Sequence, residues 1–247
     1  MNRYFYDLHM HSCLSPCGDN DMTPNNMAGM AALKGLQIAA LTDHNSSRNC
    51  PAFLRACKAN GIVGVPGMEL TTSEDIHMLC LFETLDAALA FNDEVDKKRI
   101  RIVNKPEIFG EQLVMDENDG IVGREEHLLI NATTLSLEEA TDAARSFGAF
   151  ITPAHVDKQA NGILAILGDF PAFPVFPTVE FNKAETIETC KKTYPNLANC
   201  FAITDSDAHY LWDISEAEHA ITLDDEPYSS DRIRHELIET LKSGGNA

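Results

Sequence analysis

The feature that most constrains the fold is a regular alternation of short apolar segments with amphipathic ones. Seven short runs rich in apolar and β-branched residues have the character of buried strands, and helical patterns lie between most of them. The runs span residues 4–9, 36–44, 62–70, 76–82, 148–156, 176–183 and 199–209. Strands that alternate with helices favour a parallel α/β fold, which can be either a barrel or an open sheet.

Several helix boundaries are marked by capping residues. Thr23 is a good N-cap, Pro24 suits the first turn, and Gly35 predicts the end of that helix after Lys34. Further helices are predicted over residues 52–59, 136–148, 183–195 and 230–242. These segments supply the connections that parallel strands require.

Residues 93–134 break the alternation. They contain two strand-like segments around Asp119-Gly120, a dipeptide that favours a hairpin turn. We therefore expect a single domain over residues 1–247 that carries a small hairpin and helical insertion at 93–134. The insertion is a candidate cap over the functional site.

Charge and cysteine usage limit the classes of partner. The formal net charge is −19, from 19 Lys and Arg against 38 Asp and Glu, which disfavours a long nucleic acid. A small anionic substrate fits if bound cations neutralise the site locally. Seven cysteines without CxxC spacing, no secretion signal and no membrane-spanning apolar run favour free thiols in a cytoplasmic protein.

Histidines and acids gather at the ends of the predicted strands. In a β/α barrel those ends converge on one face, and residues two apart on a strand point to the same side. His77 opens its own run but follows Glu69 by a short loop. The other members of this set at strand ends are His9, His11, His44, Glu69, His155, Asp207 and His209.

This set predicts more than one metal ion. A single Zn²⁺ takes about four ligands, and the sequence places at least seven nitrogen or oxygen donors on one face. Two or three divalent ions would use them. Imidazole and carboxylate donors favour zinc, manganese or iron over an iron–sulfur cluster.

The motifs at these strand ends resemble those of the PHP family, named for polymerase and histidinol phosphatase. "DLHMHS" is similar to its first motif, "LTDHN" to its second, "PGMEL" with "DIHML" to its third, and "SDAH" to its fourth. The resemblance spans nearly the whole chain outside the insertion. It implies a distorted, TIM-like (β/α)7 barrel with a site for two or three metals.

The resemblance also implies how the ligands divide among three ions. Two ions share Glu69, and a third requires an acid or a histidine from the loop after the first motif. Counting back from Thr23 selects Asp19 there, with Asp21 as the alternative, and leaves Cys13 and Cys17 as loop thiols. The implied sets are His9, His11, Glu69 and Asp207 for one ion, Glu69, His77 and His155 for the second, and His44, His209 and Asp19 for the third.

Clustered metals of this kind fit phosphoester hydrolysis. We expect a metal-bound hydroxide to attack phosphorus, with Glu69, Asp207 and His209 as its supporting side chains. The expected substrate is a small phosphorylated molecule such as a nucleotide, a short oligonucleotide, or a sugar or amino-alcohol phosphate. A phosphomonoesterase is favoured over a phosphodiesterase, and the sequence gives no indication of oligomeric state.

Basic residues after the second, fifth and sixth strands are candidates for binding the substrate phosphate. They are Arg48, Lys158 and Lys183, which could equally be solvated surface charges. Asn182 is a weaker candidate, and so is His127, which lies in the insertion. Asp7 and Asp43 flank ligands, where they would either orient an imidazole or accept backbone N–H groups.

Two other functional classes compete with the phosphoesterase. Amidohydrolase barrels, which cleave C–N bonds, also carry an HxH pair on the first strand, but no carboxylated-lysine position is evident here. A non-catalytic metal-binding module is the other alternative. The near-complete ligand set argues against it.

Overall fold

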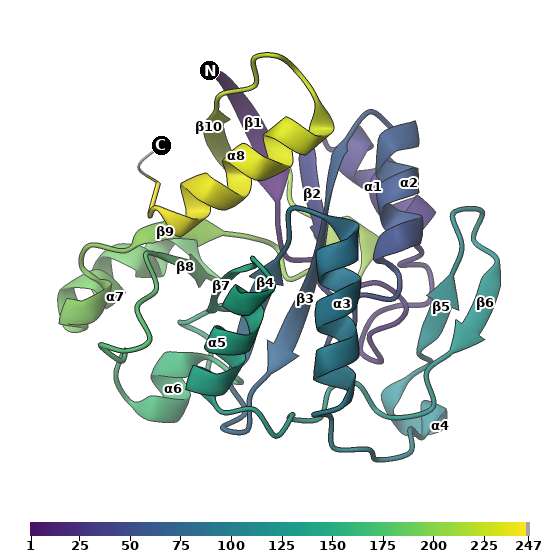
Figure 1. Ribbon diagram of the computed structural model, residues 1–247, viewed down its shortest axis with the longest axis horizontal. Helices are drawn as coiled ribbons and strands as arrows, with labels where there is room; N and C mark the ends of the chain where they lie inside the picture. Colours follow the sequence, from purple (N-terminus) through teal and green to yellow (C-terminus); the bar gives the residue numbers. More distant parts are fainter. Residues whose placement is uncertain (246–247) are drawn as a thin grey trace.

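The computed structural model describes residues 1–245 and shows a mixed α/β fold built on a curled sheet (Figure 1). The main sheet has six strands in the order β10-β1-β2-β3-β4-β7. A parallel pair, β8 and β9, forms a second sheet, and β5 and β6 form a hairpin. The strands are β1 (Asn2–Asp7), β2 (Ile38–Leu41), β3 (Val63–Thr71), β4 (His77–Leu81), β5 (Leu113–Met115), β6 (Ile121–Arg124), β7 (Phe150–Pro153), β8 (Thr178–Phe181), β9 (Phe201–Thr204) and β10 (Ala220–Leu223).

The β8–β9 pair links the two ends of the curled sheet. The Val156 N–H beyond β7 donates to the Glu180 carbonyl of β8 at 2.9 Å, and Met10 beyond β1 forms a parallel bridge with Ala208 beyond β9. These links bring the seven predicted strands around one interior. They do not form one continuous hydrogen-bonded ladder, so the count of seven β/α units stays a prediction.

All seven predicted runs contain strands, but the expectation of a fully parallel arrangement was wrong. β4 runs antiparallel to both β3 and β7. Only residues 72–76 separate β3 from β4, and a parallel crossover requires a dozen or more residues. The sequence reading also missed β10, which pairs antiparallel with β1.

The helices cover the outside of the sheet and one end of its interior. The predicted cap at Thr23 is confirmed, since its hydroxyl accepts the Asn26 N–H at 3.2 Å, and the structure adds a capping box formed by Ser136 and Glu139. The helices are α1 (Pro24–Leu33), α2 (Cys50–Ala59), α3 (Leu85–Asp96), α4 (Pro106–Phe109), α5 (Leu137–Ser146), α6 (Ile163–Leu167), α7 (Ile187–Thr193) and α8 (Ser230–Lys242), with 3₁₀ turns at Ala184–Thr186, Pro195–Leu197 and Leu211–Asp213.

Side chains alternate between two apolar layers along the strands, as the pleat requires. In β2, Ile38 and Ala40 pack with the apolar face of α8, whereas Ala39 and Leu41 pack with α1 and α2. Figure 1 shows α8 crossing the sheet beside β1 and β10. Helix α8 therefore fills the interior near the start of the strands, and the predicted metal ligands lie toward the opposite ends.

The insertion adopts the predicted hairpin and lies against loops of the main sheet. The Asn45 side chain after β2 donates to the Leu129 and Asn131 carbonyls at 2.7 and 3.0 Å, and the Thr133 N–H donates to the Thr71 carbonyl at 2.9 Å. These contacts fix residues 129–133 near the ends of β2 and β3. A role for residues 93–134 as a cap stays a prediction.

Two sequence expectations concern the chain as a whole. All seven cysteines are free thiols, as predicted. Within residues 1–245, every helix is too short or too polar to span a bilayer.

Candidate metal centre

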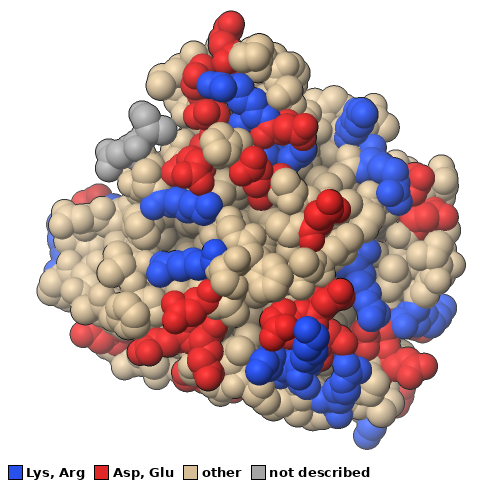
Figure 2. Space-filling model, viewed as in Figure 1, with Lys and Arg blue, Asp and Glu red and all other residues tan. Residues whose placement is uncertain are grey.

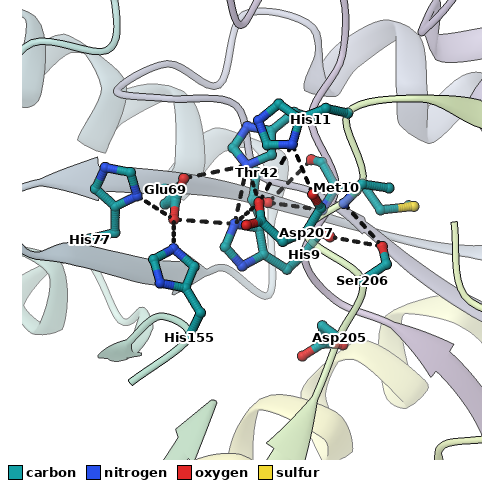
Figure 3. A network of polar contacts seen from close by, with 12 residues as sticks. His9, Met10, His11, Thr42, Glu69, His77, His155, Asp205, Ser206 and Asp207 are labelled. Carbon is teal, nitrogen blue, oxygen red and sulfur yellow. Dashed lines mark hydrogen bonds and ion pairs between the residues drawn. The ribbon is translucent and has the colours of Figure 1, made fainter. Parts of the chain in front are cut away.

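Glu69 lies at the centre of a cluster of histidines. Its carboxylate is fully buried near the end of β3. One oxygen, Oε1, lies 2.8 Å from His77 Nδ1 and 3.0 Å from His155 Nε2, and the other, Oε2, lies 2.9 Å from His44 Nδ1. In Figure 3, His77 and His155 lie on one side of this carboxylate, and His9, His11 and Asp207 lie on the other.

The HxH pair after β1 completes the other side of the cluster. The Nε2 atoms of His9 and His11 are 3.1 Å apart, and both face Glu69, at 3.3 Å from one of its oxygens. Asp207 Oδ1 lies 3.5 Å from His9 Nε2 and 3.1 Å from His11 Nε2. Glu69 is thus flanked by five imidazoles, which is the arrangement expected of a carboxylate shared between ions.

Three groups of donor atoms are close enough to hold an ion, with all ligand atoms of a group within 4.8 Å of one another. The first matches one predicted ligand set in full. The other two combine predicted ligands differently, because His44 reaches Glu69 and His11 lies beside His44 and His209. The groups are His9, His11, Glu69 and Asp207; His44, Glu69 and His77; and His11, His44 and His209.

The chemistry of these donors fits divalent metal ions. Buried polar atoms normally have hydrogen-bond partners. Within the described part of the chain, His44 Nδ1, Glu69 Oε2 and His155 Nδ1 are buried and lack such a partner. Two of these atoms, His44 Nδ1 and Glu69 Oε2, approach each other at 2.9 Å without hydrogen-bonding geometry. Imidazole and carboxylate donors converging in this way suit zinc, manganese or iron.

Unusual backbone conformations help to aim two of these side chains. His155 and Asp207 have φ angles of 30° and 51°, in the left-handed region that non-glycine residues rarely adopt. Such strain persists where the surrounding structure enforces it, and it concentrates at functional sites. The position of these two residues at strand ends does not by itself predict a left-handed backbone conformation.

Glu180 on β8 is a functional candidate that the sequence reading did not assign. Its Oε1 and Oε2 lie 2.9 and 3.1 Å from His9 Nδ1, and Oε2 also accepts the His155 N–H at 3.0 Å. A carboxylate on one imidazole nitrogen fixes the proton there and leaves the other nitrogen free for a metal. The only sequence signal that could have identified Glu180 is the occurrence of an acidic residue within an apolar strand.

The two aspartates that flank predicted ligands have different roles. Asp7 accepts backbone N–H groups from Ser206 at 3.1 Å and Ser215 at 2.9 Å, which ties the end of β1 to later loops. Asp43 Oδ1 accepts the Ser15 hydroxyl at 2.7 Å, and Ser15 Oγ lies 3.1 Å from His11 Nδ1. Asp43 therefore orients a histidine through Ser15, whereas Asp7 organises the backbone.

Electrostatics within the cluster shift the pKa values strongly. Burial alone would lower the pKa of His11, but hydrogen bonds to Asp207 and Glu69 outweigh it and raise the pKa to about 9. Burial opposes ionisation of Glu69, yet the neighbouring histidines, His77 first, hold its pKa well below the usual value. Burial and the charge of His11 lower the pKa of His209 to about 3. The Glu69 and Asp207 carboxylates, both with lowered pKa values, are therefore ionised at neutral pH.

The three candidate substrate-binding cations lie in different surroundings. The Lys158 ammonium pairs with Asp207 Oδ2 at the cluster. Arg48 Nη1 pairs with Glu125 of the insertion at 2.7 Å. Lys183 is exposed, and its backbone N–H donates to Asp157 at 3.3 Å, as does that of Asn182 at 2.7 Å. Only Lys158 of these directly contacts a predicted ligand.

The remaining predicted residues lie outside the three donor groups. Asp19 is half-buried, and its Oδ1 accepts the Asp21 N–H at 2.8 Å. Asp21 is exposed. His127 Nδ1 lies 3.6 Å from Glu125 Oε1 within the insertion. A ligand role for Asp19 stays a prediction.

Sequence comparison finds a curated relative for part of the chain. An uncharacterised protein, MJ1587, from Methanocaldococcus jannaschii is 31% identical over 100 residues, which cover 37% of this chain and 58% of that protein. The chain thus spans less than two thirds of this relative's length.

Three solved structures share the fold at low sequence identity. The lesion-specific endonuclease PfuEndoQ from Pyrococcus furiosus is 18% identical with a TM-score of 0.62, and the match covers all of this chain and 57% of that one. A proposed metal-dependent phosphoesterase from Bifidobacterium adolescentis is 16% identical with a TM-score of 0.57, covering 94% and 95%. An amidohydrolase from Chromobacterium violaceum is 18% identical with a TM-score of 0.55, covering 89% and 92%.

The family assignment follows from a match that contains most of the cluster. The family model for the PHP domain matches residues 7–163, a span that begins at the HxH motif and includes Glu69, His77 and His155. The chain belongs to the PHP domain family.

Proposed function

We propose that this protein is a metal-dependent phosphoesterase that hydrolyses a small phosphorylated substrate, a phosphomonoester in preference to a diester. The observation that carries the proposal is the convergence of five imidazoles on the two oxygens of Glu69. A buried carboxylate flanked by histidines on both sides would suit adjacent divalent ions. Membership of the PHP family supports the same class of chemistry.

The residues divide into three sites for ions. We assign His9, His11, Glu69 and Asp207 to one ion, and Glu69, His77 and His155 to a second. His44 and His209 contribute to a third. Bound divalent ions would supply a hydroxide near neutral pH and offset the negative charge that develops on the phosphoryl oxygens.

Several side chains of the protein would prepare this site for an anionic substrate. Lys158 reaches the cluster through Asp207, and its pKa is raised, against the effect of burial, by the charge of that carboxylate. The ammonium group therefore stays protonated at neutral pH and is placed to bind a phosphoryl oxygen. Glu180 holds the His9 ring in one orientation.

The charge of the protein supports a small substrate. The net charge is −19, and on the face shown in Figure 2 lysines and arginines lie beside aspartates and glutamates instead of forming one basic surface. A long nucleic acid needs many cationic contacts with its phosphates. The fold is shared with an endonuclease whose structure with a duplex substrate is known, so a nucleic-acid substrate belongs in the test.

The test compares ester classes on the metal-loaded protein. Chelator-treated protein is reloaded with Zn²⁺, Mn²⁺ or Fe²⁺ and assayed on p-nitrophenyl phosphate, nucleoside monophosphates, bis-p-nitrophenyl phosphate and a short oligonucleotide. We expect metal-dependent phosphate release from monoesters, abolished by Glu69→Gln. Hydrolysis of diesters alone would reassign the substrate class.

A parallel panel tests the other hydrolase class. The amidohydrolase from Chromobacterium violaceum shares this fold, so dihydropyrimidines and lactones are assayed under the same conditions. Turnover of these compounds without any phosphoester hydrolysis would replace the proposal. Absence of turnover across both panels, with metal fully bound, would favour a non-catalytic metal-binding module.

A further inference from the structure

A cleft between α6 and α7 adjoins the candidate metal centre. Its volume of about 360 Å³ lies near the lower end of the range of about 300 to 1,000 Å³ for small-molecule pockets. In Figure 1, these two helices lie at the left of the view. Side chains from both sides line the cleft, with Leu164 and Ala165 on α6 and with Glu185, Thr189, Cys190 and Tyr194 on and around α7.

Lys158 belongs to both the cleft and the cluster. Its side chain lines the cleft, and its ammonium group pairs with Asp207, one of the candidate metal ligands. The carbon chain of a lysine is only four methylenes long. A molecule whose phosphoryl group contacts this ammonium can therefore extend along the lysine side chain into the cleft.

The inner end of the cleft is built by two loops that are bonded to each other. Asp157 Oδ1 accepts the Asn182 N–H at 2.7 Å, and its Oδ2 accepts the Thr186 hydroxyl at 2.6 Å. A Cβ at Gly162 would collide with the Lys158 carbonyl oxygen, so the loop after β7 is also tightly folded on itself. These contacts preform the cleft, which lowers the cost of ordering it around a ligand.

The walls of the cleft combine apolar surface with negative charge. Leu164 and Ala165 supply aliphatic surface, and Tyr194 supplies an aromatic ring. The carboxylates of Asp157 and Glu185 also line the cleft. Such walls suit an uncharged carbon skeleton, whereas a second phosphate or a carboxylate would face like charges.

We propose that this cleft binds the alcohol part of the phosphomonoester and selects a compact, partly apolar group without a second anionic substituent. The inference deepens the proposed function and rests on it for the hydrolysis of a monoester. It places the phosphoryl group at the cluster, beside the Lys158 ammonium, and the leaving group between α6 and α7. Among small phosphorylated molecules, it disfavours bisphosphates and phosphorylated carboxylic acids.

A bulky side chain at the edge of the cleft tests this location. Ala165 is exposed on α6, so Ala165→Trp can fill the cleft without entering the core. We expect kcat/KM for phenyl phosphate to fall roughly 10-fold or more, and kcat/KM for methyl phosphate, which is too short to reach the cleft, to stay unchanged. The matched control is Ile166→Trp at the next helix position, which should leave both values unchanged. Equal losses for the two esters in Ala165→Trp would overturn the proposal.

Two esters of similar shape test the selection by charge. Meta-carboxyphenyl phosphate carries a second anionic group, and meta-carbamoylphenyl phosphate does not. We expect the natural protein to prefer the carbamoyl ester, and Glu185→Gln to reduce this preference. Glu188→Gln, at an exposed position on α7, is the control and should keep it. A natural protein that turns over both esters equally, or a preference that survives Glu185→Gln in full, would contradict the selection by charge.

Cys190 gives a readout that needs no turnover, because its half-buried thiol lines the cleft. The metal-loaded protein is labelled with N-ethylmaleimide in the presence of phenylphosphonate or methylphosphonate, whose C–P bonds are not esters, and Cys190 is followed by peptide mapping. We expect phenylphosphonate to slow the labelling and methylphosphonate to leave it unchanged. Equal rates with the two phosphonates would overturn the cleft assignment. Selective protection in a protein that hydrolyses no ester would support the cleft and count against the proposed function, so the two failures are distinguishable.

Discussion

Glu180 Oε1 lies 2.9 Å from His9 Nδ1, and both side chains are buried beneath the cluster. The two residues are 171 positions apart in the chain. The contact orients the ring so that Nε2 faces Glu69 and Asp207, and a bound metal would take Nε2 while the proton stays on Nδ1. This orientation suits the ligand role proposed for His9.

Glu180→Gln should weaken binding of the ion held by His9 and His11. An amide cannot accept the imidazole proton as strongly as a carboxylate, and removing such a partner typically costs about 10- to 100-fold in metal affinity. Competition with a chromophoric chelator measures the change. Glu185→Gln, at an exposed position in the 3₁₀ turn after β8, is the matched control, and equal affinity in both variants would contradict the role of Glu180.

Glu69→Gln should remove more metal than any single histidine variant. Glu69 belongs to two of the three donor groups, whereas His77 belongs to one. We expect loss of two equivalents of metal from Glu69→Gln and of one from His77→Ala, measured by elemental analysis after dialysis. Equal losses would show that Glu69 does not serve two ions.

Lys158→Ala should raise KM for a phosphomonoester far more than Arg48→Ala. Lys158 contacts Asp207 at the cluster, but Arg48 is engaged by Glu125. A hydrogen bond to a charged group contributes about 1.5–3 kcal/mol, which corresponds to roughly 10- to 100-fold in KM. Steady-state kinetics on the same ester checks this order. A larger increase in KM from Arg48→Ala than from Lys158→Ala would instead assign phosphate binding to the side of the cluster where Arg48 contacts the insertion.

The metal-free protein should lose stability at alkaline pH. Although burial lowers the pKa of His11 and His44, neighbouring groups raise each to about 9, above the ordinary value of 6.5. Histidines with a raised pKa in the folded state increase the free energy of unfolding. This contribution is fully present below pH 6.5, the pKa in the unfolded chain, and is lost as the pH rises through 9. The melting temperature of chelator-treated protein should therefore fall between pH 7 and pH 10.

The metal-loaded protein provides the contrast for this pH dependence. Metal competes with protons for the same imidazoles, so the apparent affinity for metal should rise as the pH increases from 6 to 8. Isothermal titration calorimetry measures the metal affinity at each pH, and differential scanning calorimetry measures the melting temperature of the metal-free and metal-loaded protein. A metal-free melting temperature that is higher at pH 10 than at pH 7 would show that the histidines are not stabilised as cations.

The clustering of the candidate ligands was predictable because the signal is local. HxH after β1 and DxH after β9 follow from residue spacing and from the strand ends, and the structure places these side chains together. Glu180 was not predictable as a partner of His9, because one acid in an apolar run does not reveal a contact 171 residues away. The same limit applies to the pairing of Lys158 with Asp207.

The direction of β4 could have been inferred from loop length. The five residues at 72–76 cannot form a crossover between parallel strands, although the apolar pattern of β4 resembles that of its neighbours. β10 was harder to recognise, because its four residues, "AITL", carry too short a pattern to distinguish a strand from a loop. Its pairing with β1 depends on tertiary contacts.

The most direct test of the central claim is an anomalous difference map recorded at the absorption edge of the bound metal, with phosphate present. The account predicts separate peaks on either side of the Glu69 carboxylate, one beside His9, His11 and Asp207 and another beside His77 and His155, with phosphate in contact with both. A fully metal-loaded crystal without anomalous density next to Glu69 would contradict it.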